Sequence, residues 1–276
     1  MKPVPLEDNF EDVLMKAARG LGFGKQFLSD QSGLSSNQIE SLLRGQADTE
    51  AIRAIASVLQ LNAEALINLA NDAWRPPPIE IDGLVCLNTA FPVSGYEAMT
   101  VNSFLVRSPG TDSAVIFDTG SDADGLFRVM ESLGVDLKAL FLTHTHRDHV
   151  AAYDSILAAK PGLPSYVSAS EPYGQATGLS HGTAFSMDHL QIEARLTPGH
   201  SPGGLTYLVE GLERPLAFVG DALFCLSQGG VPKSAYQAAR QANREQIFSL
   251  PDETVLCPGH GPLTTVAWER ARNPFY

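Results

Sequence analysis

The sequence has few cysteines, no long apolar run and little positive charge. Cys86, Cys225 and Cys257 are odd in number and widely spaced, so they do not indicate a disulfide framework. No stretch approaches the roughly 18 to 20 apolar residues that a membrane-spanning helix needs. The net charge is −12, which disfavours nucleic acid as the main partner because nucleic acid is a polyanion.

Two further features are not indicated by the sequence. The first residues carry neither the basic start nor the apolar core of a secretory signal, which predicts a cytoplasmic protein without membrane contacts. The Gly-x-Ser-x-Gly match at residues 199–203 lies in a Pro-Gly-His segment that offers a metal ligand, so a serine nucleophile is not indicated. A chain of 276 residues can bury a large core, in one domain or two.

Five of the seven histidines fall in one pattern. Three of them lie in the run Thr-His-Thr-His-Arg-Asp-His, which begins where the apolar, strand-like segment 139–143 ends. The later candidates each follow a glycine that closes an apolar run, where the backbone can turn tightly and direct the side chain. Imidazoles and carboxylates suit zinc, iron or manganese, and this spacing can supply two neighbouring ions. The candidate ligands are His144, His146, Asp148, His149, His200, Asp221 and His260.

In chain order these motifs resemble those of the metallo-β-lactamase-fold hydrolases, over roughly residues 80–276. The resemblance implies an α+β fold, a four-layer αβ/βα sandwich, with the ligands along one edge. It also implies two divalent metal ions, for which zinc is expected and iron and manganese remain open. His144, His146 and His200 resemble the ligands of the first metal, and Asp221 resembles a bridging carboxylate.

The remaining roles follow from the same resemblance. Asp148, His149 and His260 resemble the ligands of the second metal. Asp118, in Asp-Thr-Gly, resembles a supporting acidic residue behind the ligands. A metal-bridging hydroxide would attack the substrate carbonyl, and Asp148 would orient that hydroxide and pass a proton to the leaving group.

The substrate class is narrowed by the segments around two ligands. The carboxylate of Asp221 resembles the bridging aspartate of glyoxalase II-like hydrolases and quorum-signal lactonases. Zinc β-lactamases lack this aspartate. Segments 220–224 and 258–265 are most similar to small glyoxalase II-type thioester hydrolases. A small thioester or ester is therefore expected as substrate. A lactonase and a persulfide dioxygenase with a single iron remain alternatives.

Four residues are candidates for substrate contact. Tyr96 and Met99 lie in a long loop between the first two expected strands, and Lys233 and Tyr236 follow Asp221. Packing or solvated positions are the alternative for each of them.

Residues 1–74 lack any strand pattern and repeat apolar residues at helical spacing, which predicts a small all-helical domain. Residues 75–79 contain three prolines and predict a stiff linker, so the hydrolase domain would span 80–276. Segment 27–39 resembles the helix-turn-helix of Cro/repressor-type domains, with a turn at Gly33 and a cap at Ser35 or Ser36.

The charge of this part argues against a DNA-binding role. Residues 1–75 hold seven basic and ten acidic residues, a net charge of −3, whereas phosphate binding needs positive charge. DNA binding, as part of a regulator with a metal-dependent sensor domain, remains an alternative. A helical module that packs on the hydrolase or forms homodimer contacts is favoured over it.

Overall fold

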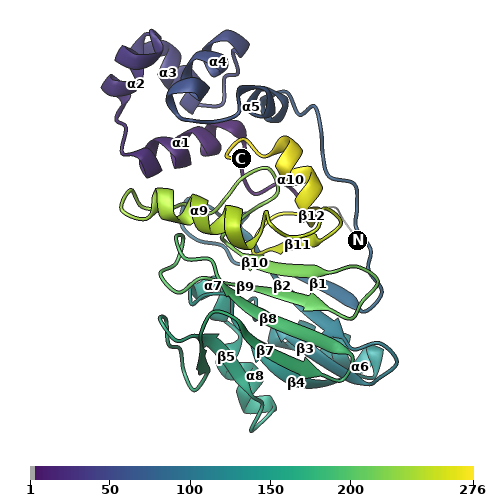
Figure 1. Ribbon diagram of the computed structural model, residues 1–276. Coiled ribbons are helices and arrows are strands. Elements are labelled where there is room, and N and C mark those ends of the chain that lie inside the picture. Colours follow the sequence, from purple (N-terminus) through teal and green to yellow (C-terminus); the bar gives the residue numbers. More distant parts are fainter. Residues whose placement is uncertain (1–3) are drawn as a thin grey trace.

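The computed structural model of the protein describes residues 4–276, and two six-stranded sheets form its centre. The strand order is β1-β2-β3-β4-β5-β6 in one sheet and β12-β11-β10-β9-β8-β7 in the other (Figure 1). The strands are β1 (Leu84–Ala90), β2 (Thr100–Arg107), β3 (Ser113–Phe117), β4 (Asp136–Phe141), β5 (Ser165–Ser168), β6 (Thr177–Leu179), β7 (Thr183–Met187), β8 (Leu190–Leu196), β9 (Leu205–Glu210), β10 (Leu216–Gly220), β11 (Val255–Pro258) and β12 (Thr264–Thr265).

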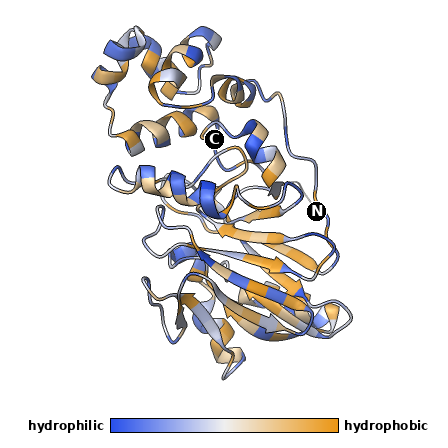
Figure 2. Ribbon diagram, in the orientation of Figure 1, coloured by the Kyte–Doolittle hydropathy of each residue, from blue (hydrophilic) through white to orange (hydrophobic). Residues whose placement is uncertain are grey.

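The apolar faces of the two sheets pack against each other. Phe117 of β3 stacks on Phe218 of β10 with ring centroids 3.8 Å apart, inside one cluster of buried residues from both sheets. Figure 2 shows the strands coloured mainly as hydrophobic. Burial of this apolar area is the main force that holds the sheets together.

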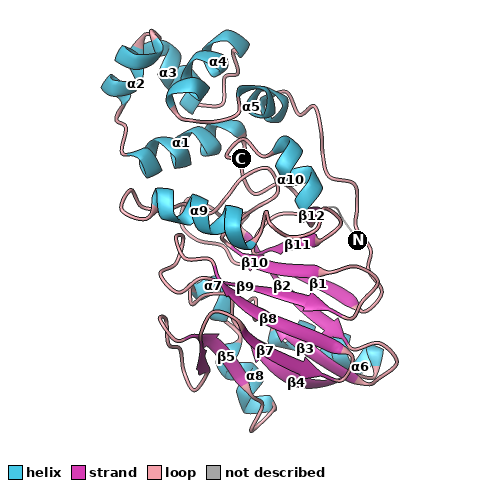
Figure 3. Cartoon of the chain, viewed as in Figure 1, coloured by secondary structure: helices cyan, strands magenta, loops and turns pink. Residues whose placement is uncertain are grey.

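Helices cover the outer face of each sheet, as Figure 3 shows. Leu126, Met130 and Ile156 pack on the first sheet. Ile247 and Val266 pack on the second. The fold is therefore the predicted α+β, four-layer αβ/βα sandwich. These outer helices are α6 (Ala123–Leu133), α7 (Arg147–Val150), α8 (Tyr153–Ala159), α9 (Tyr236–Gln246) and α10 (Val266–Arg272).

Most of the expected elements are present, but one helix is not continuous. The sequence predicts strands near 83–89, 101–106 and 114–117 and a helix over 122–133, each within a residue or so of the structure. The sequence also predicts a single helix over 149–159, and this prediction is wrong because α7 and α8 are separate. The amide of Ala152 donates to the carbonyl of Gly120 and to the hydroxyl of Thr119 instead of to the carbonyl four residues back. This contact ties α7 to the turn after β3.

Five helices precede the sandwich, in agreement with the expectation for residues 1–74. The turn between the second and third has Gly33 in the left-handed conformation (φ 73°), and Ser35 caps the third helix. Among residues 4–276, no helix combines the length and apolarity needed to cross a membrane. The five helices are α1 (Phe10–Leu21), α2 (Lys25–Ser32), α3 (Ser36–Leu43), α4 (Thr49–Val58) and α5 (Ala63–Ala70).

These helices pack on the rest of the chain. Tyr236 and Ala239 of α9, together with Phe275, lie in the same buried cluster as the apolar residues of α1 to α5. A Cβ atom on Gly20 of α1 would overlap the ring of Tyr236, so the two helices touch closely. The helices therefore pack on the rest of the chain, as one of the expectations from the sequence has it, and their role stays a prediction. The position of the boundary at residues 75–79 stays a prediction.

Candidate metal centre

The histidine run is fixed by the turn after β3. Strands β3 and β4 are parallel neighbours, so their carboxyl ends lie side by side. Asp118 has a left-handed backbone (φ 56°) and accepts hydrogen bonds from the amide (2.7 Å) and the hydroxyl (2.8 Å) of Thr143. The buried carboxylate thereby holds the residue that precedes His144.

The second sheet brings the other candidates to the same edge. His200 follows β8, Asp221 follows β10 and His260 follows β11, which is parallel to β10. A Cβ atom on Gly259 would overlap Asp221 and His149, and Gly220 is left-handed (φ 50°) against Thr143. Glycine is needed at both places because the two sheet edges approach so closely there.

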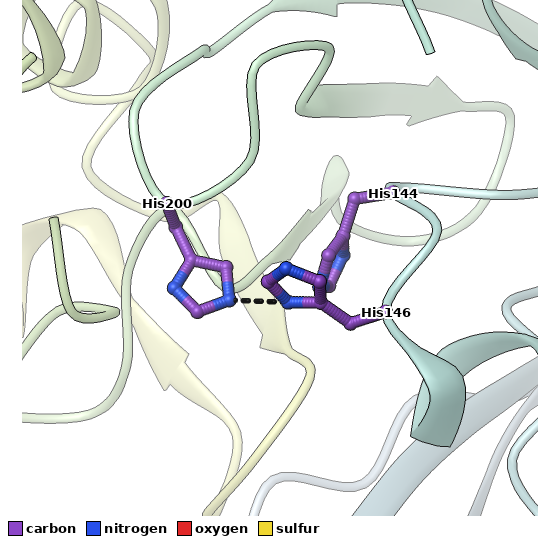
Figure 4. Close-up of side chains that lie close together, drawn as sticks. All are labelled: His144, His146 and His200. Carbon is purple, nitrogen blue, oxygen red and sulfur yellow. Dashed lines mark hydrogen bonds between the residues drawn. The ribbon is translucent and has the colours of Figure 1, made fainter. Parts of the chain in front are cut away.

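The structure brings six of the seven candidates together in two groups. His144, His146 and His200 form one group, and Asp148, His149 and His260 form the other, each with ligand atoms within 4.8 Å of one another. Figure 4 shows the first group, with the His200 Nε2 atom 2.8 Å from the His146 Nδ1 atom. Within the second, the Nε2 atom of His260 lies 3.2 Å from the Oδ2 atom of Asp148.

Asp221 lies between the two groups. Its Oδ2 atom is 3.2 Å from His200 Nε2 in the first group and 3.6 Å from His260 Nε2 in the second. Its Oδ1 atom is 3.3 Å from His149 Nε2. A single carboxylate thus reaches ligands of both groups, which is the arrangement that a bridging ligand requires.

The outer ring nitrogens of four histidines have hydrogen-bond partners, whereas three inner atoms of the site have none. Partners on the outside fix which nitrogen faces inward, as in metal sites where the second nitrogen of a ligating histidine is bonded to protein. Among the described residues, the Nε2 atoms of His144 and His149 and the Oδ1 atom of Asp221 are buried without a hydrogen bond. Divalent cations would satisfy these atoms, so the residues fit two metal ions. The outer pairs are His144 Nδ1 with Thr143 Oγ1 (3.0 Å), His149 Nδ1 with Asp118 Oδ2 (2.8 Å), His200 Nδ1 with Gly230 O (3.0 Å) and His260 Nδ1 with Thr100 O (2.7 Å).

Electrostatics also favours cations here. Burial would raise the pKa of Asp221, but three neighbouring imidazoles hold it well below its usual value. Burial would lower the pKa of His149, but Asp118 and Asp221 raise it well above the usual value. Burial lowers the pKa of His144. The site therefore draws positive charge to its carboxylates, and metal ions would replace the protons that imidazoles carry without them.

The residues of this site lie within a segment that matches a known protein family. The profile of the Metallo-beta-lactamase superfamily matches residues 96–260, a segment that holds all seven candidate ligands. The chain belongs to the metallo-beta-lactamase superfamily.

Within the superfamily, relatives with different names are similar to this chain. "Hydroxyacylglutathione hydrolase GloC" of Haemophilus influenzae is 30% identical over 192 residues, which are 59% of this chain and 87% of that protein. "Persulfide dioxygenase ETHE1, mitochondrial" of Mus musculus is 28% identical over 157 residues, 53% of this chain and 59% of that protein. The crystal structure of the "BLEG-1 B3 metallo-beta-lactamase" matches with a TM-score of 0.59 and 26% identity, covering 70% of this chain and 98% of that one.

The four candidates for substrate contact are more scattered. Tyr96 is 71% exposed, and it lies with Met99 in the loop between β1 and β2. Lys233 lies against Gly22, the C-cap residue that follows α1. Only 1% of Tyr236 is exposed, which leaves no surface for a substrate, so it is a packing residue. Substrate contact by the other three stays a prediction.

Sequence reasoning missed Glu171, in the loop after β5. Its Oε1 atom accepts hydrogen bonds from the amide (3.0 Å) and hydroxyl of Thr145, between His144 and His146. Its Oε2 atom accepts from the hydroxyl of Ser201 and the amide of Gly203 (2.9 Å), next to His200. Glu171 therefore joins the two loops of the first ligand group. No motif surrounds it, so only the folded chain reveals it.

Proposed function

We propose that the protein is a dinuclear metal-dependent hydrolase that cleaves a small acyl thioester or ester, as a glyoxalase II-like enzyme does. The observation that carries the proposal is the position of Asp221, within 3.6 Å of imidazoles from both ligand groups. A site for two adjacent ions suits hydrolysis, because two bound cations lower the pKa of a shared water and polarise a carbonyl.

The position of each residue suggests its role in metal binding or catalysis. His144, His146 and His200 would hold the first ion, and Asp148, His149 and His260 the second, with Asp221 shared. Asp148 is 7% exposed and thus reaches the edge of the site, where it can accept a hydrogen bond from water. In thioester hydrolysis, water would give one proton to Asp148 and add to the carbonyl carbon, the C–S bond would break, and Asp148 would pass that proton to the leaving sulfur. A carboxylic acid and a thiol result.

The thioester assignment is supported by the relative named hydroxyacylglutathione hydrolase and by the carboxylate at position 221. The similarity to the BLEG-1 metallo-beta-lactamase structure supports the fold and the metal site. It gives less support to β-lactam hydrolysis. Zinc β-lactamases lack the bridging aspartate that Asp221 resembles, and we therefore propose no β-lactam substrate.

Metal analysis and a substrate screen test the proposal together. Protein reconstituted with zinc, iron or manganese should hold about two ions per chain, and the screen should include thioesters such as S-lactoylglutathione, simple esters and lactones. Asp148→Ala should lower hydrolysis about 10²- to 10⁴-fold, whereas Asp154→Ala on the exposed side of α8 should not. Two bound ions with no hydrolysis of any of these substrates would refute the assignment.

The relative named persulfide dioxygenase motivates one other activity. That reading requires a single iron per chain and oxygen uptake with glutathione persulfide. A full second group, made by Asp148, His149 and His260, favours two ions instead. One bound iron together with oxygen consumption would replace hydrolysis as the function.

For the N-terminal helices we propose a helix-turn-helix-like arrangement, a boundary at residues 75–79, and no DNA binding. The support is the turn at Gly33 and the cap at Ser35 between α2 and α3. Glu40 of α3 pairs with both Lys25 and Arg44, so little positive charge is left for phosphate groups. A gel-shift assay with genomic fragments at low salt should show no complex; a shift would reverse this assignment.

A further inference from the structure

The loop of residues 221–230, here called the Asp221 loop, carries more of the metal centre than its one ligand. The carbonyl of Gly230 accepts the hydrogen bond from the Nδ1 atom of His200 (3.0 Å). The amide of Gly229 donates to the carbonyl of Asp221 (3.1 Å), so the loop folds back on itself. The position of this loop therefore determines both the position of Asp221 and the orientation of the His200 ring.

Helix α1 and the segment just before it hold the Asp221 loop from outside. The ammonium group of Lys16 donates to the carbonyl of Gln228 (2.9 Å) and pairs with the carboxylate of Asp8. Asp8 in turn accepts from the hydroxyl of Ser227. Asp8 is 7% exposed, and Ser227 and Gln228 are each 1% exposed. Buried groups of this kind need their partners, so the contact fixes the backbone of the loop.

The same segment also reaches the opposite side of the centre. Lys16 lies over the ring of Phe224, with its Nζ atom 4.7 Å from the ring centroid, and that ring meets the imidazole of His260 edge-on. The Oε2 atom of Glu7 is 3.9 Å from the Nδ1 atom of His260. Figure 1 shows α1 lying along α9, beside the end of the chain. The N-terminal segment thus contacts the surroundings of both Asp221 and His260.

We infer that the N-terminal helices are part of the metal centre, with Asp8 and Lys16 as positioning residues that hold the Asp221 loop so that Asp221 and His200 meet the metal ions. This part of the chain lies outside residues 96–260, which the superfamily profile matches. The inference rests on the metal binding in the proposed function, and it does not depend on the substrate.

A different part of the same interface provides a control. Trp74 packs edge-on against Trp268 of α10, with centroids 5.6 Å apart, and Arg272 lies over its ring. Within residues 4–276, no hydrogen bond or ion pair joins any of these three residues to a candidate ligand. Trp74 lines a small cavity with Leu226 but makes no hydrogen bond to the Asp221 loop, so loss of this packing should weaken the docking of the helices while the hydrogen bonds that hold the loop remain.

The experiment measures Zn²⁺ affinity of the full chain by competition with a chromophoric chelator. We expect Lys16→Met and Ser227→Ala to weaken Zn²⁺ binding on the order of tenfold, because supporting contacts of metal ligands have effects of this size. Lys16→Arg keeps the charge and the donors and should stay near wild type. Trp74→Leu should lower the melting temperature and leave Zn²⁺ affinity unchanged.

Two results would overturn the inference: wild-type affinity in both Lys16→Met and Ser227→Ala, or an equal loss in Trp74→Leu. If Lys16→Met does not fold, Ser227→Ala decides, because it removes a single hydroxyl. A wild-type protein that binds Zn²⁺ but cleaves no substrate would sink the proposed hydrolase and leave this inference intact. A wild-type protein that binds none of zinc, iron and manganese would refute both.

Discussion

At the scale of single residues, Asp118 is the carboxylate on which the histidine run depends. It accepts three hydrogen bonds, two from Thr143 and one from the Nδ1 atom of His149 (2.8 Å). In Asp118→Asn the side-chain NH₂ group, itself a donor, would face one of these donors. His149 would lose the acceptor that fixes its tautomer. We expect metal affinity to fall about 10- to 100-fold. Asp124→Asn, at an exposed position of α6, is the matched control. Equal affinity in the two variants, measured by chelator competition, would show that Asp118 does not support the site.

Glu171 should affect the first ligand group selectively. Glutamine offers one acceptor oxygen where glutamate offers two, so Glu171→Gln would leave either Thr145 or the Ser201–Gly203 segment without a partner. We expect the variant to retain one ion more tightly than the other, so metal content under limiting chelator falls from about two ions per chain to about one. Metal analysis at stepped chelator concentrations checks this. Simultaneous loss of both ions would mean that Glu171 does not act on one group alone.

At the scale of elements, α10 contains a buried carboxylate that should make stability depend on pH. Glu269 is fully buried, and burial raises its pKa from 4.5 to about 7. It accepts hydrogen bonds from the amide of Leu226 (2.9 Å), the hydroxyl of Thr264 (2.7 Å) and the side chain of Asn273 (2.8 Å). Because the folded pKa lies above the unfolded one, the stabilisation is complete below about pH 4.5 and is lost as the pH rises to about 7.

Glu269→Gln should remove this dependence, because the amide cannot ionise. Between pH 5 and pH 8 the free energy of unfolding of the wild type should fall by an amount on the order of 3 kcal/mol relative to that of the variant. Urea unfolding of the metal-free proteins across this range provides the measurement. Parallel pH curves for the two proteins would contradict the expected burial effect.

The elements also show which features of the fold can be predicted from the sequence. Glycine before a ligand at the end of an apolar run predicted where Gly199, Gly220 and Gly259 turn the chain, because this signal is local. The break between α7 and α8 was missed, because it depends on a hydrogen bond from Ala152 to Gly120, about thirty residues away in sequence. Glu171 was missed for the same reason. A contact between distant segments leaves no pattern in either segment.

At the scale of the whole molecule, the sequence separates the N-terminal helices from the sandwich more sharply than the structure does. The prolines near residue 76 suggest two independent units, and apolar spacing alone could not show which surface the helices cover. In the structure, Val231 and Tyr236 belong to the same buried cluster as the helices. We therefore expect the chain to unfold as one cooperative unit.

Gly20 is the position where this expectation can be tested. Alanine is a better helix former than glycine by up to about 1 kcal/mol, so Gly20→Ala would stabilise an isolated α1. In the structure, its Cβ atom would overlap the ring of Tyr236, and such overpacking costs about 1 to 3 kcal/mol. Gly24→Ala is the control, because nothing lies within 4 Å of the added atom and only a weaker helix cap, worth less than about 1 kcal/mol, is expected. Calorimetry should show one transition that moves to lower temperature in Gly20→Ala, with metal release at the same temperature. Two transitions, with metal release unaffected by Gly20→Ala, would show that the helices and the sandwich fold independently.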